Sequence, residues 1–566
     1  MSGAVDARAA RVAVVADPVG GGGRLRRVDE QGAPVGEVRT VGDLAAAVGE
    51  IEAAAAPRWV WAGTDEVYPD LLDRGGVRLA RCHDVRLVET LLLGAEGRWG
   101  RPRSLGAAWA RLRGLPEPPD APEHGAEGQP VLFTADRLHL PPGTDALAAL
   151  VEVHAAQQRR VAEGEHPERM RLLCAAESAG ALAAVEMGRD GLPWSAAAHD
   201  ELLTGLLGPR PAAGVRPALL AGLAQQIQDA LGGRPVNPDS PAQLLPAFAR
   251  VGVPLASTRS HELRKVAHPA AELLLRYKEL SRIHAAHGWA WREAWVRDGR
   301  FRPEYVVGGV VSGRWATRGG GALQIPRPLR AAVVADPGHR LVVADAGQLE
   351  PRVLAAMSGD PGLARAAAGG DLYATLARDA FAGDRPRAKI ALLAAMYGQT
   401  SGEAGQLLAV MRRRFPAALA LVESAARTGE AGGIVRSQLG RTSPAPSADR
   451  FLDESADPAD GASPDRRAAR SWGRFTRNFV IQASAADWAL AMLAALRREL
   501  ARIGAPPRLV FFQHDEVVVH TPAELAPAVE AAVASSADEA RRLVFGGTPV
   551  PFPLETHAVE CYADAK

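Results

Sequence analysis

The chain has 566 residues, a formal net charge of +1 and an isoelectric point near 7.9. A hydrophobic fraction of 47% beside 23% charged residues is typical of a soluble globular protein, and this length exceeds what one hydrophobic core usually supports. General basicity is excluded, so any site for a polyanion must concentrate its positive charge on one surface.

Neither the start of the chain nor its cysteines indicate secretion or a membrane. The opening stretch lacks a long apolar core after basic residues, and no apolar run reaches membrane-spanning length. Cys82, Cys174 and Cys561 are odd in number and far apart, which argues against a disulfide framework and against a cysteine-based zinc site. We therefore expect a cytoplasmic protein with no membrane partner.

Residues 11 to 150 alternate short apolar runs with helical stretches. The runs are RVAVVAD, RWVWAG, VRLARC and QPVLFTAD, and the helical stretches include VGDLAAAVGEIEAAA and VRLVETLLLG. This alternation predicts an α/β domain. From Leu172 the pattern becomes helical and ends with PAAELLLRYKELSRIHAAHG, which contains Lys278 and Arg282. For these two residues, a solvated helix face is as good an interpretation as a functional one.

Asp345 lies where a strand is expected to give way to a helix. Leu341 to Ala344 are apolar and predict a buried strand, and Leu349, Val353 and Met357 follow at helical spacing. By itself, Asp345 is more simply read as the N-cap of that helix.

A second acidic group lies far downstream, in RLVFFQHDEVVVHTP. Two β-rich runs, Leu509 to Phe512 and Val517 to Val519, flank Asp515 and Glu516 and predict a tight hairpin with these carboxylates in its turn. For the hairpin alone, an ordinary turn aspartate is the simpler interpretation.

Between the two acidic groups, RPRAKIALLAAMYGQT places two cations, a leucine and a tyrosine at every fourth position. Arg385, Lys389, Leu393 and Tyr397 therefore form one stripe of a helix, with cations toward one end and an aromatic ring at the other. An amphipathic helix with two stray cations would look the same. Only four lysines occur among 66 basic residues, so Lys389 is a position where the chain keeps lysine against a strong arginine bias.

A further helix, SWGRFTRNFVIQASAADWALAMLAALRREL, carries Arg474, Asn478 and Gln482 at i, i+4 and i+8. These side chains share one helix face, which could simply be solvated. Asp345, the Arg385 to Gly398 helix and His514-Asp515-Glu516 occur in the same order as the three polymerase motifs of family A DNA polymerases, the DNA polymerase I type, and the chain resembles that family. The likeness extends over nearly the whole chain and is strong from about Leu263.

The resemblance implies a mixed α/β fold. It would be a right hand with an antiparallel palm sheet and helical fingers and thumb, preceded by a ribonuclease H-like α/β domain of the 3′-to-5′ exonuclease type, with no 5′-nuclease region ahead of it. The expected domains are 1–155 exonuclease-like, 156–305 connector and thumb, 306–360 palm, 361–480 fingers and 481–566 palm.

The resemblance also implies template-directed DNA synthesis in repair or replication by a monomer that binds primer-template DNA and deoxynucleoside triphosphates. Two Mg²⁺ ions, for which Mn²⁺ can substitute, would assist phosphoryl transfer. The implied metal ligands are Asp345 and Asp515, and the implied catalytic residues are these two with Glu516 and Lys389. The implied dNTP-binding residues are Arg385, Lys389, Leu393, Tyr397, Gln348, Glu350 and His514, and the implied DNA-binding residues are Lys278, Arg282, Arg314, Gln324, Arg474, Asn478 and Gln482.

The sequence departs from the family pattern at several places. Leu393 stands where the family usually has Phe or Tyr, and the segment from Val310 keeps Gly313, Arg314, Gln324 and Pro326 but lacks the usual Asn after Gln324. In the exonuclease-like domain, Val19, Tyr68 and Pro141 occupy positions where that chemistry needs two carboxylates and a tyrosine. Asp17 and Asp145 remain, and Asp65, Asp70 and Asp84 lie near the second motif. We therefore expect no proofreading.

Two other functions fit the same pattern. One is a catalytically weak or dead protein that binds primer-template DNA, against which the retained Asp345, Asp515 and Glu516 argue. The other is a polymerase that uses ribonucleotides or an RNA template, against which Glu350 and the Arg474-Asn478-Gln482 face argue.

Overall fold

The computed structural model describes residues 11–120, 138–318, 324–398, 403–446, 464–504 and 507–565. The chain divides into two compact units, and each is described by itself. The first contains residues 1–189, 304–319 and 344–556, and the second contains residues 190–303, 320–343 and 557–566. The predicted mixed α/β class is confirmed. The predicted segments QPVLFTAD and most of SPAPSADRFLDESADPADGASP lie outside the described residues.

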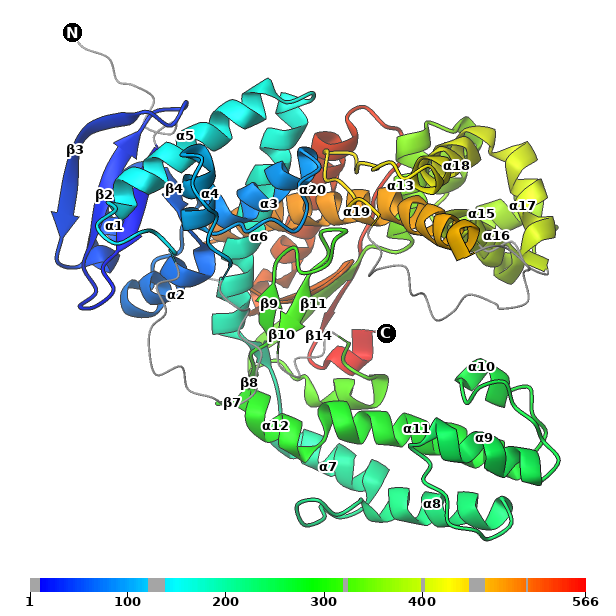
Figure 1. Ribbon diagram of the computed structural model, residues 1–566. Coiled ribbons are helices and arrows are strands. Elements are labelled where there is room, and N and C mark those ends of the chain that lie inside the picture. Colours follow the sequence, from blue (N-terminus) through cyan, green and yellow to red (C-terminus); the bar gives the residue numbers. More distant parts are fainter. Residues whose placement is uncertain are drawn as a thin grey trace. The chain divides into compact units, whose positions relative to one another are not determined.

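The amino-terminal part of the first unit is built on a five-stranded sheet with the order β3-β2-β1-β4-β5 (Figure 1). β1 pairs antiparallel with β2 and parallel with β4, so hairpin and crossover connections meet at the central strand. The strands are β1 (Arg11–Ala16), β2 (Gly23–Val28), β3 (Pro34–Val41), β4 (Arg58–Trp61) and β5 (Arg81–Asp84). The run VRLARC thus becomes a strand only from Arg81, and β2 and β3 are additions to the predicted elements.

Helices cover both faces of this sheet. The helices are α1 (Leu44–Ala55), α2 (Thr64–Gly75), α3 (Val85–Ala95), α4 (Leu105–Leu112), α5 (Ala146–Glu163) and α6 (Pro167–Asp190). Leucines and valines of α1 and α2 pack on one face around Trp59 and Trp61, and those of α4 and α5 pack on the other around Ala13 and Val60. The alternation of apolar runs and helical stretches is therefore explained by a sheet buried between two helical layers.

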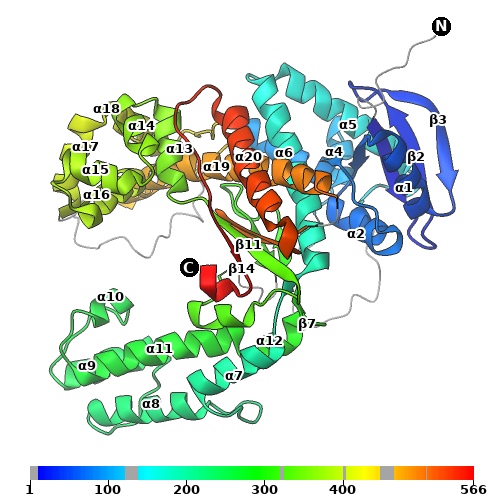
Figure 2. The same ribbon diagram turned by 180° about the vertical axis from the view of Figure 1, so that it is seen from behind.

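The rest of the first unit is mostly helical. It contains α13 (Leu349–Ser358), α14 (Pro361–Ala368), α15 (Leu372–Ala380), α16 (Arg385–Tyr397), α17 (Glu403–Arg414), α18 (Pro416–Glu430), α19 (Pro464–Arg502), η4 (Ala523–Leu525) and α20 (Ala526–Phe545). Its strands include the hairpin β9 (Glu304–Val306) and β10 (Ala316–Arg318). Figure 2 shows α13 to α18 gathered in one group of helices, with α19 running from them toward α6.

A four-stranded sheet has the order β12-β13-β11-β14. The strands are β11 (His339–Asp345), β12 (Arg508–Gln513), β13 (Glu516–Pro522) and β14 (Glu555–Val559), and the chain passes between the two units inside β11 and inside β14. Leu341 to Ala344 are at most 1% exposed, as the prediction of a buried strand requires. The predicted hairpin is confirmed, because β12 and β13 pair antiparallel.

The second unit consists mainly of helices. They are α7 (Ala196–Leu207), α8 (Ala218–Ala230), α9 (Pro241–Arg250), α10 (Ser260–Leu263), α11 (Pro269–His287), α12 (Trp289–Trp295), η2 (Arg327–Ala332) and η5 (Tyr562–Ala565). A small sheet has the order β6-β8-β7 and is formed by β6 (Leu192–Pro193), β7 (Val296–Arg297) and β8 (Arg300–Phe301). The helical pattern predicted after Leu172 is confirmed.

Helix α19 is long and apolar enough to cross a membrane by length and composition, with a window of mean hydropathy 1.6, although no uninterrupted apolar run marks it in the sequence. Within the described residues it is the one helix that passes this test. Its apolar window is 89% buried inside the protein, as in the core helix of a soluble protein.

Candidate active site

The end of β11 and the β12–β13 turn are joined by a backbone hydrogen bond. The Ala346 N–H donates to the Asp515 carbonyl oxygen at 2.9 Å, so the residue after Asp345 touches the backbone of the second aspartate. Because β13 starts beside the point where β11 ends, these neighbouring strands run antiparallel. Two carboxylates predicted from segments far apart in the sequence therefore belong to one edge of one sheet.

The hairpin turn is shorter than the sequence pattern indicated. Gln513 pairs with Glu516, which leaves only His514 and Asp515 as turn residues. Glu516 is the first residue of β13 and is 5% exposed, so its predicted place in the turn is wrong. A two-residue loop returns the chain to strand geometry at once, and this turns the Glu516 side chain into the protein.

Two residues of this region have the left-handed backbone that non-glycine residues rarely adopt. Gln348 has φ +62° and His514 has φ +55°. Such conformations cost free energy and persist where the surrounding structure fixes them, often at functional sites. Burial lowers the pKa of His514, and the nearby Arg314 cation lowers it further, which favours a neutral imidazole.

Glu350 lies on the first turn of α13 and is held from two sides. Arg314 lies in the loop between β9 and β10 and donates to Oε1. The Tyr397 hydroxyl donates to Oε2 at 2.6 Å. The Glu350 side chain is 15% exposed. Burial and the hydrogen bond to Glu350 raise the pKa of Tyr397 to about 12. Arg314, predicted to bind DNA, and Tyr397, predicted to bind dNTP, are thus brought together by one carboxylate.

The predicted stripe along α16 is present. Arg385 and Lys389 are exposed, Leu393 and Tyr397 are half-buried, and residues on the opposite face, such as Ala391 and Ala395, are fully buried. The Arg385 Nε donates to Asp371 Oδ2 at 2.8 Å. Gln348 donates from its amide nitrogen to the other Asp371 oxygen at 2.8 Å and accepts from the Leu372 N–H at 2.8 Å.

Arg474, Asn478 and Gln482 lie on one side of α19, at positions more exposed than Phe479, Val480 and Ile481 beside them. Gln482 reaches Tyr397 with a side-chain hydrogen bond. The Asn478 Oδ1 atom is buried and has no hydrogen-bond partner within the described part of the chain, which leaves an acceptor available to a ligand.

The remaining predicted DNA-binding residues lie in the second unit. Arg282 and Gln324 are exposed. The Lys278 ammonium donates to the Thr258 carbonyl oxygen and, at 3.0 Å, to its hydroxyl, and burial lowers the pKa of Lys278. Arg282 and Gln324 therefore present their side chains to solvent, whereas Lys278 is engaged within its own unit.

A divalent-metal site fits the donors at the end of β11. Within the described residues no group of three or more His, Cys, Asp or Glu side chains could hold a metal ion. Mg²⁺ is usually held by one or two carboxylates, with the other oxygens coming from water and substrate phosphates. Asp345 and Asp515 supply two hard oxygen donors on adjacent segments, which is the donor set of such a substrate-completed site.

In the amino-terminal domain, the carboxylates near the exonuclease-type motifs are engaged as helix caps or ion-pair partners. Asp84 is 1% exposed and accepts hydrogen bonds from the Thr64 N–H and hydroxyl and from the Leu87 N–H, so it caps α3. Asp65 pairs with Arg86, and Asp145 caps α5 and pairs with Arg24 at 3.0 Å. Tyr68 is fully buried and donates to Glu186.

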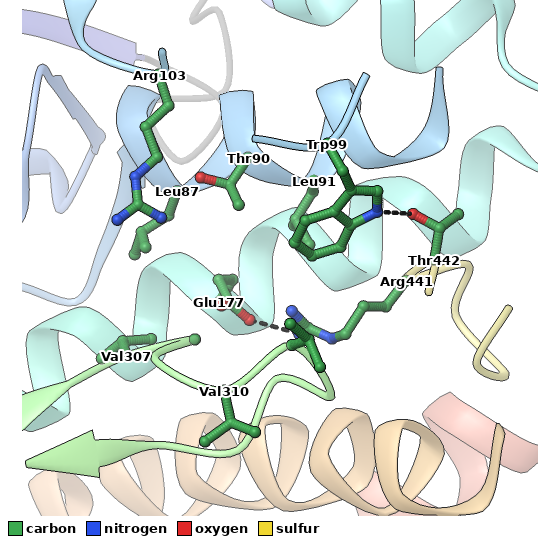
Figure 3. A pocket seen from close by; sticks show the side chains of 12 residues that line it. Leu87, Thr90, Leu91, Trp99, Arg103, Glu177, Val307, Val310, Arg441 and Thr442 are labelled. Atoms are coloured by element: carbon green, nitrogen blue, oxygen red, sulfur yellow. Dashed lines mark hydrogen bonds and ion pairs between the residues drawn. The ribbon is translucent and has the colours of Figure 1, made fainter. Parts of the chain in front are cut away.

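Sequence reasoning missed two groups of residues. Asp371 precedes α15 as its N-cap, a signal that was visible in the sequence, although its bond to Arg385 was not. The second is a buried ion cluster in which Arg441 binds Glu177 at 2.6 Å (Figure 3). In the same cluster Arg441 binds Asp487 at 3.4 Å. Glu177 lies 264 residues from Arg441, so no local pattern could indicate this pair.

Comparisons with known proteins agree with this geometry. A family model described as DNA polymerase family A matches residues 217–562, which is more than half of the chain. The chain therefore belongs to DNA polymerase family A. The predicted resemblance is confirmed.

The chain is 29% identical over 325 residues to DNA polymerase I of Chloroflexus aurantiacus, a match that covers 53% of this chain and 33% of that protein. It is 26% identical over 529 residues to the thermostable DNA polymerase I of Thermus aquaticus, covering 82% of this chain and 60% of that protein. This chain thus spans less than two thirds of the length of these relatives.

One solved structure with a similar fold is the POL domain of Pol1 from M. smegmatis, in complex with DNA primer-template and dNTP. The TM-score is 0.68 with 19% sequence identity, and the match covers 99% of this chain and 96% of that chain. At this identity the likeness shows that the fold is shared.

Proposed function

We propose that this chain is a template-directed DNA polymerase that adds deoxynucleotides to a primer 3′-hydroxyl, acting as a monomer in DNA repair or replication. The observation that carries the proposal is the Ala346 to Asp515 hydrogen bond, which brings Asp345 and Asp515 together in a family A chain. The proposed division is palm at 306–360 and 481–566, fingers at 361–480, connector and thumb at 156–305, and an exonuclease-like domain at 1–155.

In this proposal Asp345 and Asp515 bind two Mg²⁺ ions, with Glu516 as a supporting carboxylate. When bound, the metal ions neutralise the charge that develops on the attacking and leaving oxygens during phosphoryl transfer. Arg385 and Lys389 bind the triphosphate, to which they are accessible on the exposed stripe of α16. Lys389 carries a proton that it can release to pyrophosphate, which guanidinium cannot do.

The other residues align the substrates. His514 contacts the primer end, and Tyr397 lies beside the template position being copied. Gln348, Glu350 and Leu393 surround the nucleotide. The proposed contacts to primer and template are Arg314, Arg474, Asn478 and Gln482 in the first unit and Lys278, Arg282 and Gln324 in the second.

Primer extension tests the proposal directly. The purified chain is incubated with a primed template, four dNTPs and Mg²⁺, and the products are resolved by length. We expect template-directed extension that stops when EDTA removes the metal. If the chain binds primer-template DNA but extends no primer with Mg²⁺ or Mn²⁺, it is instead a DNA-binding protein. If it extends primers with ribonucleotides as fast as with dNTPs, it belongs to the ribonucleotide-using class.

Glu350 should exclude ribonucleotides. Its carboxylate is fixed by Arg314 and Tyr397 on the first turn after the metal site, where it closes the space next to the sugar. We expect Glu350→Ala to raise the ratio of rNTP to dNTP incorporation about 10- to 100-fold, the range that one packed group supplies. Tyr397→Phe, which keeps the ring but loses the bond to Oε2, should raise it less. An unchanged ratio in Glu350→Ala would assign the exclusion to another residue.

We also propose that the chain does not proofread. Two-metal hydrolysis needs several carboxylates around the ions. Here Asp84, Asp65 and Asp145 are used as caps or ion-pair partners, and Tyr68 is buried. We expect no degradation of single-stranded or mismatched 3′ ends above background with Mg²⁺ or Mn²⁺. Degradation that persists in Asp345→Ala and disappears in Asp17→Ala would identify a working nuclease.

A further inference from the structure

Asp371 contacts Arg385 in a way that leaves the phosphate-binding end of the guanidinium available. Its Oδ2 accepts from Arg385 Nε at 2.8 Å. The guanidinium carbon lies 5.6 Å from the centre of the Tyr373 ring, so an aromatic face supports it from another side. Within the described residues, the two terminal nitrogens of Arg385 make no hydrogen bond or ion pair.

Asp371 is itself fixed by neighbouring groups. Its Oδ1 accepts from the Gln348 amide at 2.8 Å and from the Ala374 N–H at 3.1 Å, so each carboxylate oxygen has a defined use. Partial burial opposes ionisation, yet the hydrogen bonds from Arg385, the Ala374 N–H and Gln348 lower the pKa of Asp371. The carboxylate is therefore charged at neutral pH.

Gln348 connects this arrangement to the proposed metal site. It lies three residues after Asp345 and has the left-handed backbone with φ +62°. Both ends of its amide are bound to the start of α15, through Asp371 and the Leu372 N–H. A strained residue with a fully used side chain indicates that the position of α15 relative to the end of β11 is fixed.

We propose that Asp371 is a positioning residue that orients Arg385 so that its two terminal nitrogens face the triphosphate of the incoming nucleotide, and that Gln348 holds Asp371 in place. This inference rests on the proposed polymerase function. A guanidinium held at Nε keeps its charge and its fork of terminal donors, so less rotamer freedom is lost when phosphate binds. The alternative is that Asp371 competes with the triphosphate for Arg385. In that case, removing the Asp371 charge would tighten dNTP binding, whereas the proposal predicts weaker binding.

The test is the dNTP Kd from single-turnover incorporation into a primed template by the full chain. Asp371→Asn keeps the Oδ1 acceptor that caps α15 but places an amide group against Arg385 Nε, so the helix should remain folded. We expect the Kd to rise about two- to five-fold, with little change in the maximal rate. This range corresponds to the free energy that a half-exposed ion pair contributes. Gln348→Ala should raise it less.

Asp384→Asn is the matched control, because Asp384 is the N-cap of α16 and lies next to Arg385 in the chain. It removes the same charge without touching the Nε contact, and it should not weaken dNTP binding. In an Arg385→Ala background, Asp371→Asn should have no further effect on the Kd. A lower Kd in Asp371→Asn would show competition and overturn the proposal, as would an unchanged Kd or an equal effect in the Arg385→Ala background. Failure of the unaltered chain to extend any primer would instead refute the polymerase function.

Discussion

Asp345→Ala and Asp515→Ala should each abolish primer extension while leaving primer-template binding nearly unchanged. Each substitution removes a carboxylate from one of the two segments that the Ala346 to Asp515 backbone hydrogen bond joins. Metal ions supply several kcal/mol of charge stabilisation in phosphoryl transfer, so we expect the rate to fall about a thousand-fold or more. DNA affinity depends mainly on contacts to phosphates, which neither residue makes in the proposed complex.

The measurement is single-turnover extension at saturating DNA and dNTP, with DNA affinity measured by fluorescence anisotropy. Asp538→Ala is the control, because it removes an aspartate on α20 that pairs with neighbouring arginines of its own helix. It should extend primers at the rate of the unaltered chain. Near-normal turnover in either Asp345→Ala or Asp515→Ala would refute the assignment of these residues as metal ligands.

Arg441→Ala should destabilise the fold far more than the loss of an exposed arginine. Arg441 is 6% exposed and binds Glu177 and Asp487, whose side chains are 3% and 0% exposed. Removing the guanidinium leaves two buried carboxylates without their cation, which costs about 3–5 kcal/mol. The cluster also packs closely against the candidate site. Gly313, the residue before Arg314, lies so near that an added Cβ would be 2.4 Å from the Arg441 guanidinium.

The measurement is the urea dependence of unfolding at two pH values. Burial raises the pKa of Asp487 above its usual value even with Arg441 present. A carboxyl group whose pKa is raised in the folded state lowers the free energy of unfolding of the protein as pH rises above the unfolded pKa of about 3.9. The loss of unfolding free energy caused by Arg441→Ala should therefore be larger at pH 8 than at pH 5.

Arg498→Ala is the control for this comparison. It removes an arginine on α19 that is 45% exposed and pairs with Glu539 and Glu499. Exposed pairs contribute about 1 kcal/mol or less, so the midpoint should shift little at either pH. A similarly small shift for Arg441→Ala would mean that the buried cluster does not stabilise the fold.

Local patterns were enough to predict the elements that carry the candidate site. The four apolar residues before Asp345, the two β-rich runs around Asp515 and the four-residue spacing on α16 each follow from one periodicity within one segment. The details that failed depend on geometry at single residues. Glu516 was predicted in the turn because the pattern cannot show how many residues a hairpin loop uses.

Contacts between distant segments could not be predicted from periodicity. Arg314, Glu350 and Tyr397 come from a hairpin, α13 and α16, and no repeating pattern relates their positions. The same holds for Tyr68 and Glu186, which are separated by 118 residues. Their side chains are complementary only after the strands and helices have packed, so tertiary structure is needed to find them.

The uninterrupted length of α19 constrains how this protein can change its sequence. A helix of 39 residues is roughly 58 Å long at about 1.5 Å per residue. Along this helix, Gln482 contacts Tyr397, Asp487 contacts Arg441 and Arg497 contacts Glu186. Inserting one residue between any two of these positions would turn the later ones by about 100°, so their partners could no longer be reached. Insertions and deletions should therefore be tolerated in the connecting loops and rejected within this part of α19.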